Sequence, residues 1–240
     1  MNQENADLRL AQSSETEFRI NNKKFGEIFQ INPMQVLKVN SFAGPLIHVG
    51  SKINYEDDVA RSSAERLRAF YRENLSDNDE VYGLDIFEGY NVDIVADLCD
   101  ENLFLSGDLS RYKGYFKTAI CWAVLEHVEN PFLAAKNISD FLAGGGKIYY
   151  IGPWVWGYHP YPDDYWRISF SALQVLFPCI SWDDWWYSGT SKDVGYRIKA
   201  LRNERKVFQM QMESIQEFSA ISDRSLPYAN INALGTKNAS

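Results

Sequence analysis

Two aspartates that follow short apolar runs offer the clearest chemistry in the sequence. Val81–Ile86 and Val92–Ala96 are rich in β-branched residues and are separated by the turn-forming residues Glu88–Asn91, which predicts two buried strands. Asp85 lies at the end of the first run, and Asp97 directly follows the second. Acids at the carboxyl ends of parallel strands lie where open α/β sheets bind ligands, and a carboxylate can accept both hydroxyls of a ribose. The pair indicates a nucleoside-type cofactor, with solvated acids at strand ends as the alternative.

The three histidines differ in their sequence surroundings. His159 lies in a segment dense in aromatic residues, and an imidazole is a suitable general base. A structural hydrogen bond is the alternative role for His159. His127 follows an apolar run and would either line a pocket or cap and pack against its own helix. His48 lies within an apolar run, and we expect it to be structural.

A charged cluster closes the aromatic segment. Arg167 could grip a phosphate or carboxylate of a substrate, or it could pair with Asp163 or Asp164 and pin the loop; the second role is favoured. His159 and the two aspartates also include ligand types found in metal sites. Because no further ligand is in view, the sequence predicts no metal site.

The elements around these residues predict an α/β domain. Further buried strands are expected at Pro45–Val49, Phe116–Val124 and Lys147–Ile151, and helices at Glu56–Asn74 and from Pro131 to about Leu142, ended by glycines 144–146. Strands and helices alternate along this stretch, which implies βαβ units and a parallel sheet.

The flanking regions carry weaker signals. Residues 1–40 are expected to form an N-terminal helical extension, 41–203 the main domain, and 204–240 a final helix with a polar tail. Within the main domain, residues 152–167 read as a long functional loop, and Ser169 or Ser171 could cap a short helix through Phe177. Trp182–Tyr187 and Val194–Leu201 are expected to form an antiparallel pair at the sheet edge.

Composition narrows the classes of partner. A net charge of −8 argues against a nucleic-acid backbone as the main partner, because phosphate binding requires an excess of Lys and Arg. The three cysteines are far apart and have no zinc or disulfide spacing, which favours a reducing, cytoplasmic location. No apolar run approaches the length of a membrane span, and the polar N-terminus does not resemble a signal peptide.

Five motifs, in order, resemble those of a known family. They are GLDI at 83–86, VDIVADL at 92–98, WAVLEHVENP at 122–131, LAGGGKIYYIGP at 142–153 and HPYPDDYWRIS at 159–169. Together they resemble the class I S-adenosylmethionine-dependent methyltransferases, most closely the type 11 methyltransferase domain, from about Pro45 to Phe177. The last motif is similar to that of a subgroup associated with sugar and surface-polysaccharide modification.

The resemblance implies a Rossmann-like, doubly wound, mostly parallel seven-stranded sheet with an antiparallel edge strand, and S-adenosylmethionine as cofactor. It also implies roles for residues along the strand ends. Gly50 and Ser51 would lie against the methionine part of the cofactor, and Asp85 would bind its ribose. Around the adenine, Ile86 would lie beside the base, Asp97 would accept a hydrogen bond from the amino group, and Leu98 would pack near the ring. Trp122 and Ala123 would border the sulfonium. His159 and His127 are the catalytic candidates; Trp154, Tyr158, Tyr165 and Arg167 are the candidates for substrate binding.

The first glycine motif departs from the family pattern. The family usually has an acid followed by three alternating glycines, whereas this chain has His48 in place of the acid and only Gly50 among the glycines. The expected function is methyl transfer to a small molecule, with an oxygen of a sugar or polysaccharide precursor as the acceptor. A non-catalytic protein that binds the cofactor or a partner protein is the alternative. A nicotinamide-dependent oxidoreductase would need a glycine-rich turn that is missing here. The oligomeric state is open, and a homodimer is one option.

Overall fold

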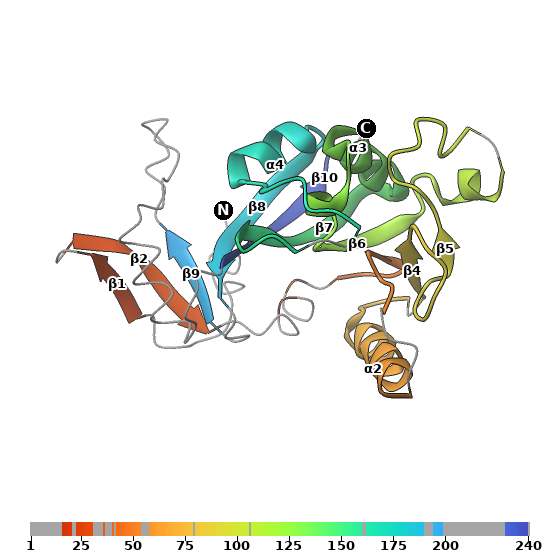
Figure 1. The fold of residues 1–240 in the computed structure, drawn as a ribbon. Helices are drawn as coiled ribbons and strands as arrows, with labels where there is room; N and C mark the ends of the chain where they lie inside the picture. The colour runs from red at the N-terminus through yellow and green to blue at the C-terminus, as the bar shows by residue number, and fades with distance from the viewer. Residues whose placement is uncertain are drawn as a thin grey trace.

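The fold is seen in a computed structural model that describes residues 16–20, 23–30, 36, 40, 42–53, 58–78, 80–105, 107–159, 162–189, 194–198 and 229–239. These residues form a ten-stranded sheet with helices on both faces (Figure 1). The strands are β1 (Thr16–Ile20), β2 (Lys23–Gln30), β3 (Leu46–Val49), β4 (Val81–Asp85), β5 (Ile94–Val95), β6 (Phe116–Trp122), β7 (Leu142–Val155), β8 (Ile180–Ser188), β9 (Val194–Ile198) and β10 (Ala229–Lys237). The helices are α2 (Asp58–Asn74), α3 (Pro131–Phe141) and α4 (Phe170–Leu176), with short 3₁₀ turns η2 (Asp108–Tyr112) and η3 (Leu125–His127).

Seven neighbouring strands form the doubly wound sheet that the sequence predicted, in the order β8-β10-β7-β6-β3-β4-β5. From β7 to β5 all neighbours pair in parallel, whereas β10 runs antiparallel between β7 and β8. Beyond β8 the sheet continues with β9, β2 and β1, each antiparallel to its neighbour. The predicted antiparallel pairing of the segments now seen as β8 and β9 is confirmed. The pair lies inside the sheet, between β10 and β2, and not at the edge where it was predicted.

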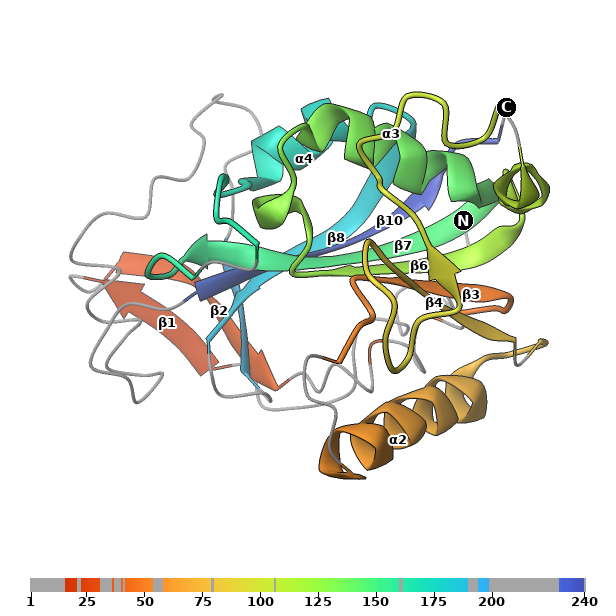
Figure 2. The same cartoon turned by 45° about the vertical axis from the view of Figure 1, so that its right-hand side comes forward.

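The direction of winding reverses between β3 and β6, and this reversal locates the site. After β3 the chain crosses through α2 to β4, and after β6 it crosses through α3 to β7 on the opposite side. Figure 2 shows α2 below the sheet and α3 and α4 above it. In open α/β sheets, ligands bind at the carboxyl ends of the strands beside such a reversal.

Local sequence signals account for the helices above the sheet. The Asn130 side chain accepts a hydrogen bond from the Leu133 amide (3.1 Å), and Pro131 occupies the first turn of α3. The Ser169 hydroxyl accepts from the Ala172 amide (3.1 Å) and caps α4. Both helices pack on a core that includes Leu84, Phe116, Ile138, Phe141, Leu173 and Phe177.

The glycine run at 144–146 belongs to β7 and does not end a helix. α3 stops at Phe141, and β7 begins with the next residue. Between two successive β6 pairings, Phe116 with Leu142 and Thr118 with Lys147, β6 advances by two residues and β7 by five, so the glycines lie in an irregularity of the strand. Gly145 has φ +76°, a conformation that a residue with a side chain rarely adopts. The same strand extends to Val155, so the expected loop begins later than predicted.

Two terminal predictions are wrong. Residues 23–30 form strand β2 instead of the start of a helical extension, and residues 229–237, expected to be a polar tail, form β10 in the interior of the sheet. The domain limits at 41 and 203 therefore leave out strands of the same sheet. β10 carries Asn and Gly and has little strand propensity of its own. Its position is fixed by pairing with β7 and β8 and by buried Asn232, whose oxygen accepts from the Tyr149 hydroxyl (3.0 Å). The helix predicted within 204–218 lies outside the described residues.

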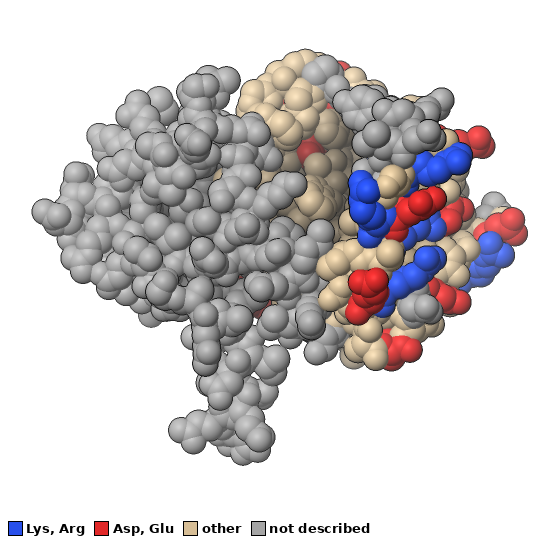
Figure 3. Space-filling view, turned by 90° about the horizontal axis from the view of Figure 1, so that it is seen from below, with Lys and Arg blue, Asp and Glu red and all other residues tan. Residues whose placement is uncertain are grey.

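Two observations bear on partners. No helix among the described residues combines the length and apolar character needed to cross a membrane. Figure 3 shows basic and acidic residues intermingled on the described part of the face seen from below. The absence of a nucleic-acid partner stays a prediction.

Candidate active site

Gly50 ends β3 in a turn that only glycine fits. Its φ is +75°, and a Cβ atom at this position would lie 2.3 Å from Cγ2 of Val124 and 3.3 Å from the carbonyl oxygen of Trp122. The amides of Gly50 and Ser51 both donate to the carbonyl of Leu84 (2.9 and 3.1 Å), which bends the chain over the end of β4. The single glycine is therefore required by close packing between the ends of β3 and β6.

Asp85 is held in position by backbone amides. Its Oδ2 accepts from the amide of Lys52 (3.1 Å), and its Oδ1 accepts from the amide of Phe87 (3.3 Å). Each oxygen retains a lone pair, so the carboxylate can still accept two ligand hydroxyls. Ile86 and Phe87 lie beside it with 47% and 46% of their surface exposed. An oriented carboxylate next to exposed apolar side chains suits a ribose and its attached base.

Ser51 is tied to the turn between β4 and β5. Its hydroxyl donates to the carbonyl of Asn91 (2.7 Å), and the Asn91 side-chain amide donates to the Ser51 carbonyl (3.0 Å). Because Ser51 is only 2% exposed, its hydroxyl is committed to this contact. The predicted contact of Ser51 with a cofactor would have to come from its backbone.

Asp97 lies at the same end of the sheet as Asp85. Asp85 pairs with Val95 in the register of β4 and β5, and Asp97 follows two residues later. The Asp97 carboxylate is exposed and accepts from the Cys99 amide (2.7 Å). Leu98 is buried in the core, and its carbonyl accepts from the Asn137 side chain (2.9 Å). The structure thus brings the two acids to neighbouring strand ends but turns Leu98 inward.

β6 ends in a strained turn. Trp122 is 43% exposed, and Ala123 adopts φ +52°, which costs about 1 kcal/mol for a residue with a side chain. The Ala123 amide donates to the Ile151 carbonyl (2.9 Å). This turn leads into η3, which carries Glu126 and His127.

Glu126 is a site residue that the sequence interpretation missed. It is 1% exposed, and neither carboxylate oxygen has a hydrogen-bond partner among the described residues. Burial raises the pKa of Glu126 to about 7, although the Arg167 charge acts in the opposite direction. An unpartnered buried carboxyl is costly, which marks a functional candidate. The only sequence signal was its place in the motif, directly before His127.

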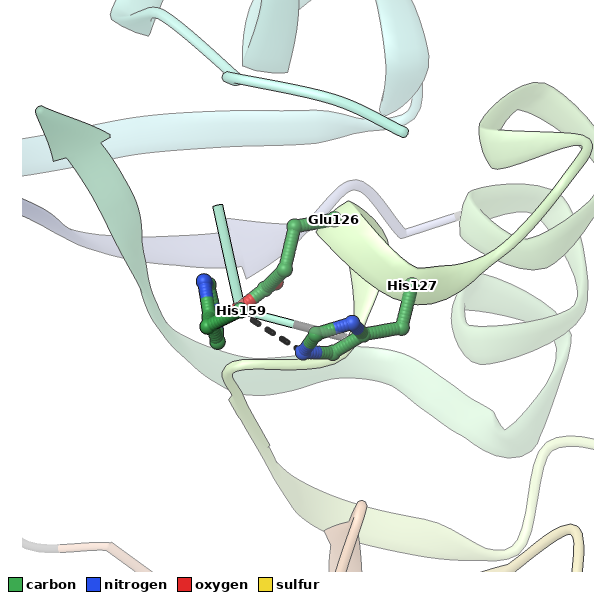
Figure 4. A group of neighbouring side chains, drawn as sticks. All are labelled: Glu126, His127 and His159. Atoms are coloured by element: carbon green, nitrogen blue, oxygen red, sulfur yellow. Dashed lines mark ion pairs between the residues drawn. The ribbon is translucent and has the colours of Figure 1, made fainter. Parts of the chain in front are cut away.

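The two predicted catalytic histidines meet at this point. The ring centroids of His127 and His159 lie 5.0 Å apart, and the His159 ring stacks on Trp156 at 4.0 Å. Figure 4 shows both rings beside the Glu126 carboxylate, with His127 and Glu126 coming from η3 and His159 from the segment after β7. Nε2 of His127 is 3.8 Å from Oε1 of Glu126.

Hydrogen bonds fix the orientation of each ring. Nδ1 of His127 is 2.5 Å from the carbonyl oxygen of Asp163, so Nδ1 carries the proton in the neutral ring and Nε2 is the free nitrogen. Nδ1 of His159 lies 3.3 Å from the Gly157 carbonyl and 3.4 Å from Oδ2 of Asp164. Either histidine could accept a proton through its Nε2.

Arg167 pins the loop through Asp164, the role favoured from the sequence. The guanidinium donates to both carboxylate oxygens of Asp164 (2.5 and 2.7 Å), and it holds the pKa of that carboxyl at about 2. Asp164 also accepts from the His159 amide (3.0 Å). The pair therefore fixes the backbone at His159. Substrate binding by Arg167 stays a prediction.

The remaining substrate candidates and His48 differ in exposure. Tyr158 and Tyr165 are 69% and 44% exposed, and the Tyr158 hydroxyl donates to Oδ1 of Asp163 (2.8 Å). Trp154 is partly buried and packs against the core. His48 is buried against Tyr71, and burial, with a contribution from the Arg68 charge, lowers its pKa to about 4. His48 thus lies buried within β3, and its structural role stays a prediction.

The comparisons with known proteins bear on the fold. No protein-family model and no curated protein matches the sequence. Among solved structures, a 1,6-didemethyltoxoflavin-N1-methyltransferase of Burkholderia thailandensis, with 1,6-didemethyltoxoflavin and S-adenosylhomocysteine bound, aligns at TM-score 0.50 and 11% identity, covering 85% of this chain and 76% of that one. The cyclase SpnF aligns at TM-score 0.49 and 12% identity over 86% of this chain and 81% of that one. The N-methyltransferase NodS of Bradyrhizobium japonicum aligns at TM-score 0.44 and 10% identity, covering 85% of this chain and 92% of that one. With the strand order, the first likeness shows that the chain has the class I methyltransferase fold.

Proposed function

We propose that this protein is an S-adenosylmethionine-dependent methyltransferase with a small-molecule acceptor. One observation carries the proposal: the carboxylates of Asp85 and Asp97 lie at the carboxyl ends of the neighbouring strands β4 and β5, on the β3 side of the reversal. Asp85 is already oriented by two backbone amides, and exposed apolar side chains flank it. This arrangement suits the ribose and adenine of the cofactor, as the sequence resemblance implied.

The residues after β6 suit the methyl acceptor. Methyl transfer is an in-line displacement, for which the protein must hold a nucleophile close to the methyl group and exclude water. Trp122 offers an exposed aromatic face where the cationic sulfonium would lie, a favourable contact. Beyond it, His127 and His159 each keep an Nε2 that could take the acceptor proton.

The acceptor is proposed to be an oxygen of a sugar or a polysaccharide precursor. A hydroxyl acceptor keeps its proton at neutral pH, so it benefits from a base, and the two histidines supply one. The motif from His159 to Ser169, similar to that of a polysaccharide-modifying subgroup, supports this choice. A cytoplasmic location is part of this proposal and is supported by three cysteines without disulfide spacing.

Two measurements test the proposal. Calorimetric titration of S-adenosylhomocysteine into the full chain should show saturable one-to-one binding. Incubation with S-adenosylmethionine and a panel of hydroxylated sugars, read by mass spectrometry, should then give S-adenosylhomocysteine and a product heavier by one methylene group. An absence of cofactor binding would reject the proposed activity.

One observation favours a second candidate, a non-catalytic protein of this fold. The space over Gly50 is filled by Val124, and the alternating glycines of the family are missing. Cofactor binding without turnover of hydroxyl, amine or thiol acceptors would support this candidate over the first.

A further inference from the structure

We propose that Glu126, His127 and His159 form a binding site for a divalent transition-metal ion, with Zn²⁺ as the preferred ion. One ligand atom from each of the three side chains can be chosen so that all lie within 4.8 Å of one another. Ligand atoms about 2.0–2.2 Å from a tetrahedral zinc ion are roughly 3.4 Å apart. Small side-chain rotations would therefore complete the shell.

The buried carboxyl of Glu126 is the second, independent observation. Both of its oxygens lack hydrogen-bond partners within the described part of the chain, and the side chain is 1% exposed. Figure 4 shows the carboxyl directed at the His127 ring. Buried charges in proteins are paired or coordinate metals. A metal ion would satisfy this carboxylate, which no described cation contacts by hydrogen bond.

The surroundings of the two imidazoles fit metal ligation. Metal-binding histidines donate their second ring N–H to a carbonyl or carboxylate, which fixes the tautomer and the ring orientation. His127 has such a contact from Nδ1 to the Asp163 carbonyl, and Nδ1 of His159 lies near the Gly157 carbonyl and Asp164. Asp164 is in turn held by Arg167. Both rings are thus oriented with Nε2 available.

The donor set selects the class of ion. Two imidazoles and one carboxylate suit Zn²⁺ and other borderline divalent ions, whereas Mg²⁺ prefers oxygen ligands. Three protein ligands leave a coordination position open. If the proposed function holds, an acceptor hydroxyl could occupy that position and lose its proton more readily. The ion would then take the place of the general base, because a histidine that ligates a metal through Nε2 cannot also accept a proton there. Metal binding itself does not depend on that function.

The test uses the full chain, freed of any affinity tag and stripped with EDTA. Calorimetric titration with Zn²⁺ should show one site, Mn²⁺ should bind more weakly, and Mg²⁺ should give no saturable signal. Glu126→Gln and His159→Ala should each weaken Zn²⁺ binding by about 100-fold or more, the upper end of losses seen even for outer-shell changes. Glu129→Gln, the same substitution at an exposed position three residues away, should bind like the wild type.

The outcomes separate this proposal from the proposed function. Wild-type protein that binds no Zn²⁺, or variants at Glu126 and His159 that bind as tightly as wild type, would overturn the metal site. Thermal melting checks that each variant is folded, and His159→Ala serves if Glu126→Gln is not. S-adenosylhomocysteine titrated into the same samples reports the cofactor site independently. Retained cofactor binding without metal binding rejects only the metal, and the reverse result rejects only the methyltransferase.

Discussion

The two halves of the carboxyl edge of the sheet stabilise their acidic side chains in different ways. Over β4 and β5, the acids Asp85 and Asp97 are accessible and are oriented by nearby backbone amides. Over β6 and β7, Glu126 and Asp164 have side chains that are only 1% exposed, among two histidines and Arg167. The first half satisfies its charges with the backbone, and the second satisfies all of them except Glu126.

This difference indicates which half of the edge carries the reactive groups. A carboxylate such as that of Asp85 is already stabilised by hydrogen bonds from nearby backbone amides. A buried carboxyl with no partner among the described residues costs stability, and such costs are concentrated at functional sites. We therefore assign cofactor binding to the first half and reactivity to the second. The following predictions test that division.

The largest expected effect is on turnover in the second half. His159→Ala should lower the turnover of the identified acceptor by about 10²–10⁴-fold, the usual contribution of a general base. Its affinity for S-adenosylhomocysteine should be unchanged, because the contacts of His159 are with Trp156, His127 and Asp164 and not with Asp85 or Asp97. Steady-state kinetics and calorimetry measure the two quantities. Wild-type turnover in this variant would remove His159 from the mechanism.

The next effect is on cofactor affinity in the first half. Asp85→Ala should weaken S-adenosylhomocysteine binding by about 100-fold, because two hydrogen bonds to a charged acceptor are lost. Asp97→Ala, which removes one such bond, should cost roughly 10-fold. Both are read by calorimetry, with circular dichroism to confirm folding. Equal affinity for S-adenosylhomocysteine in Asp85→Ala and wild type would contradict the assignment of cofactor binding to the half over β4 and β5.

A third prediction concerns the packing that joins the halves. Gly50→Ala should lower the free energy of unfolding by about 2.5 kcal/mol, because the new methyl group meets Val124 and the backbone keeps a positive φ. Adding Val124→Ala should recover only part of this loss, since it relieves the clash but not the backbone strain. Urea denaturation measures each step. Full recovery would show that backbone conformation contributes nothing.

The smallest expected effect is on the pH dependence of stability, and it comes from the buried His48, which lies outside the pair His127 and His159. His48 has a folded pKa of about 4 against about 6.5 when unfolded, so below pH 6.5 the unfolded state binds more protons and stability falls. The loss between pH 7.5 and pH 5 should be about 2 kcal/mol from this group. His48→Gln should remove that share of the pH dependence in urea titrations. An unchanged slope would mean that His48 is accessible to protons in the folded state.

The sequence predicted the parts of the fold that carry strong local signals. The strand β4 and the helix α3 were predicted to within a residue, because a short apolar run marks the strand and Asn130 with Pro131 marks the start of the helix. β10 was missed because Asn232 and Gly235 give it no strand pattern, and pairing with β7 and β8 decides its conformation. The helical extension expected over residues 1–40 was likewise overridden at residues 23–30, where β2 pairs with β1 and β9.

The site was predictable in its outline but not in its burial. Asp85 and Asp97 could be located because they follow recognisable strands, and the structure brings them to one edge. The meeting of His127 and His159 depends on how the segment after β7 folds back, which spacing alone does not specify. Glu126 was overlooked because its charge suggests a solvated surface residue, and only packing reveals that it is enclosed.

The most direct test of this account is a crystal structure of the full chain with S-adenosylhomocysteine. We predict that the ribose hydroxyls contact the Asp85 carboxylate, that the adenine lies between Ile86 and Asp97, and that the sulfur faces the turn after Trp122. A ligand bound elsewhere, with Asp85 and Asp97 free of contact, would contradict the central claim.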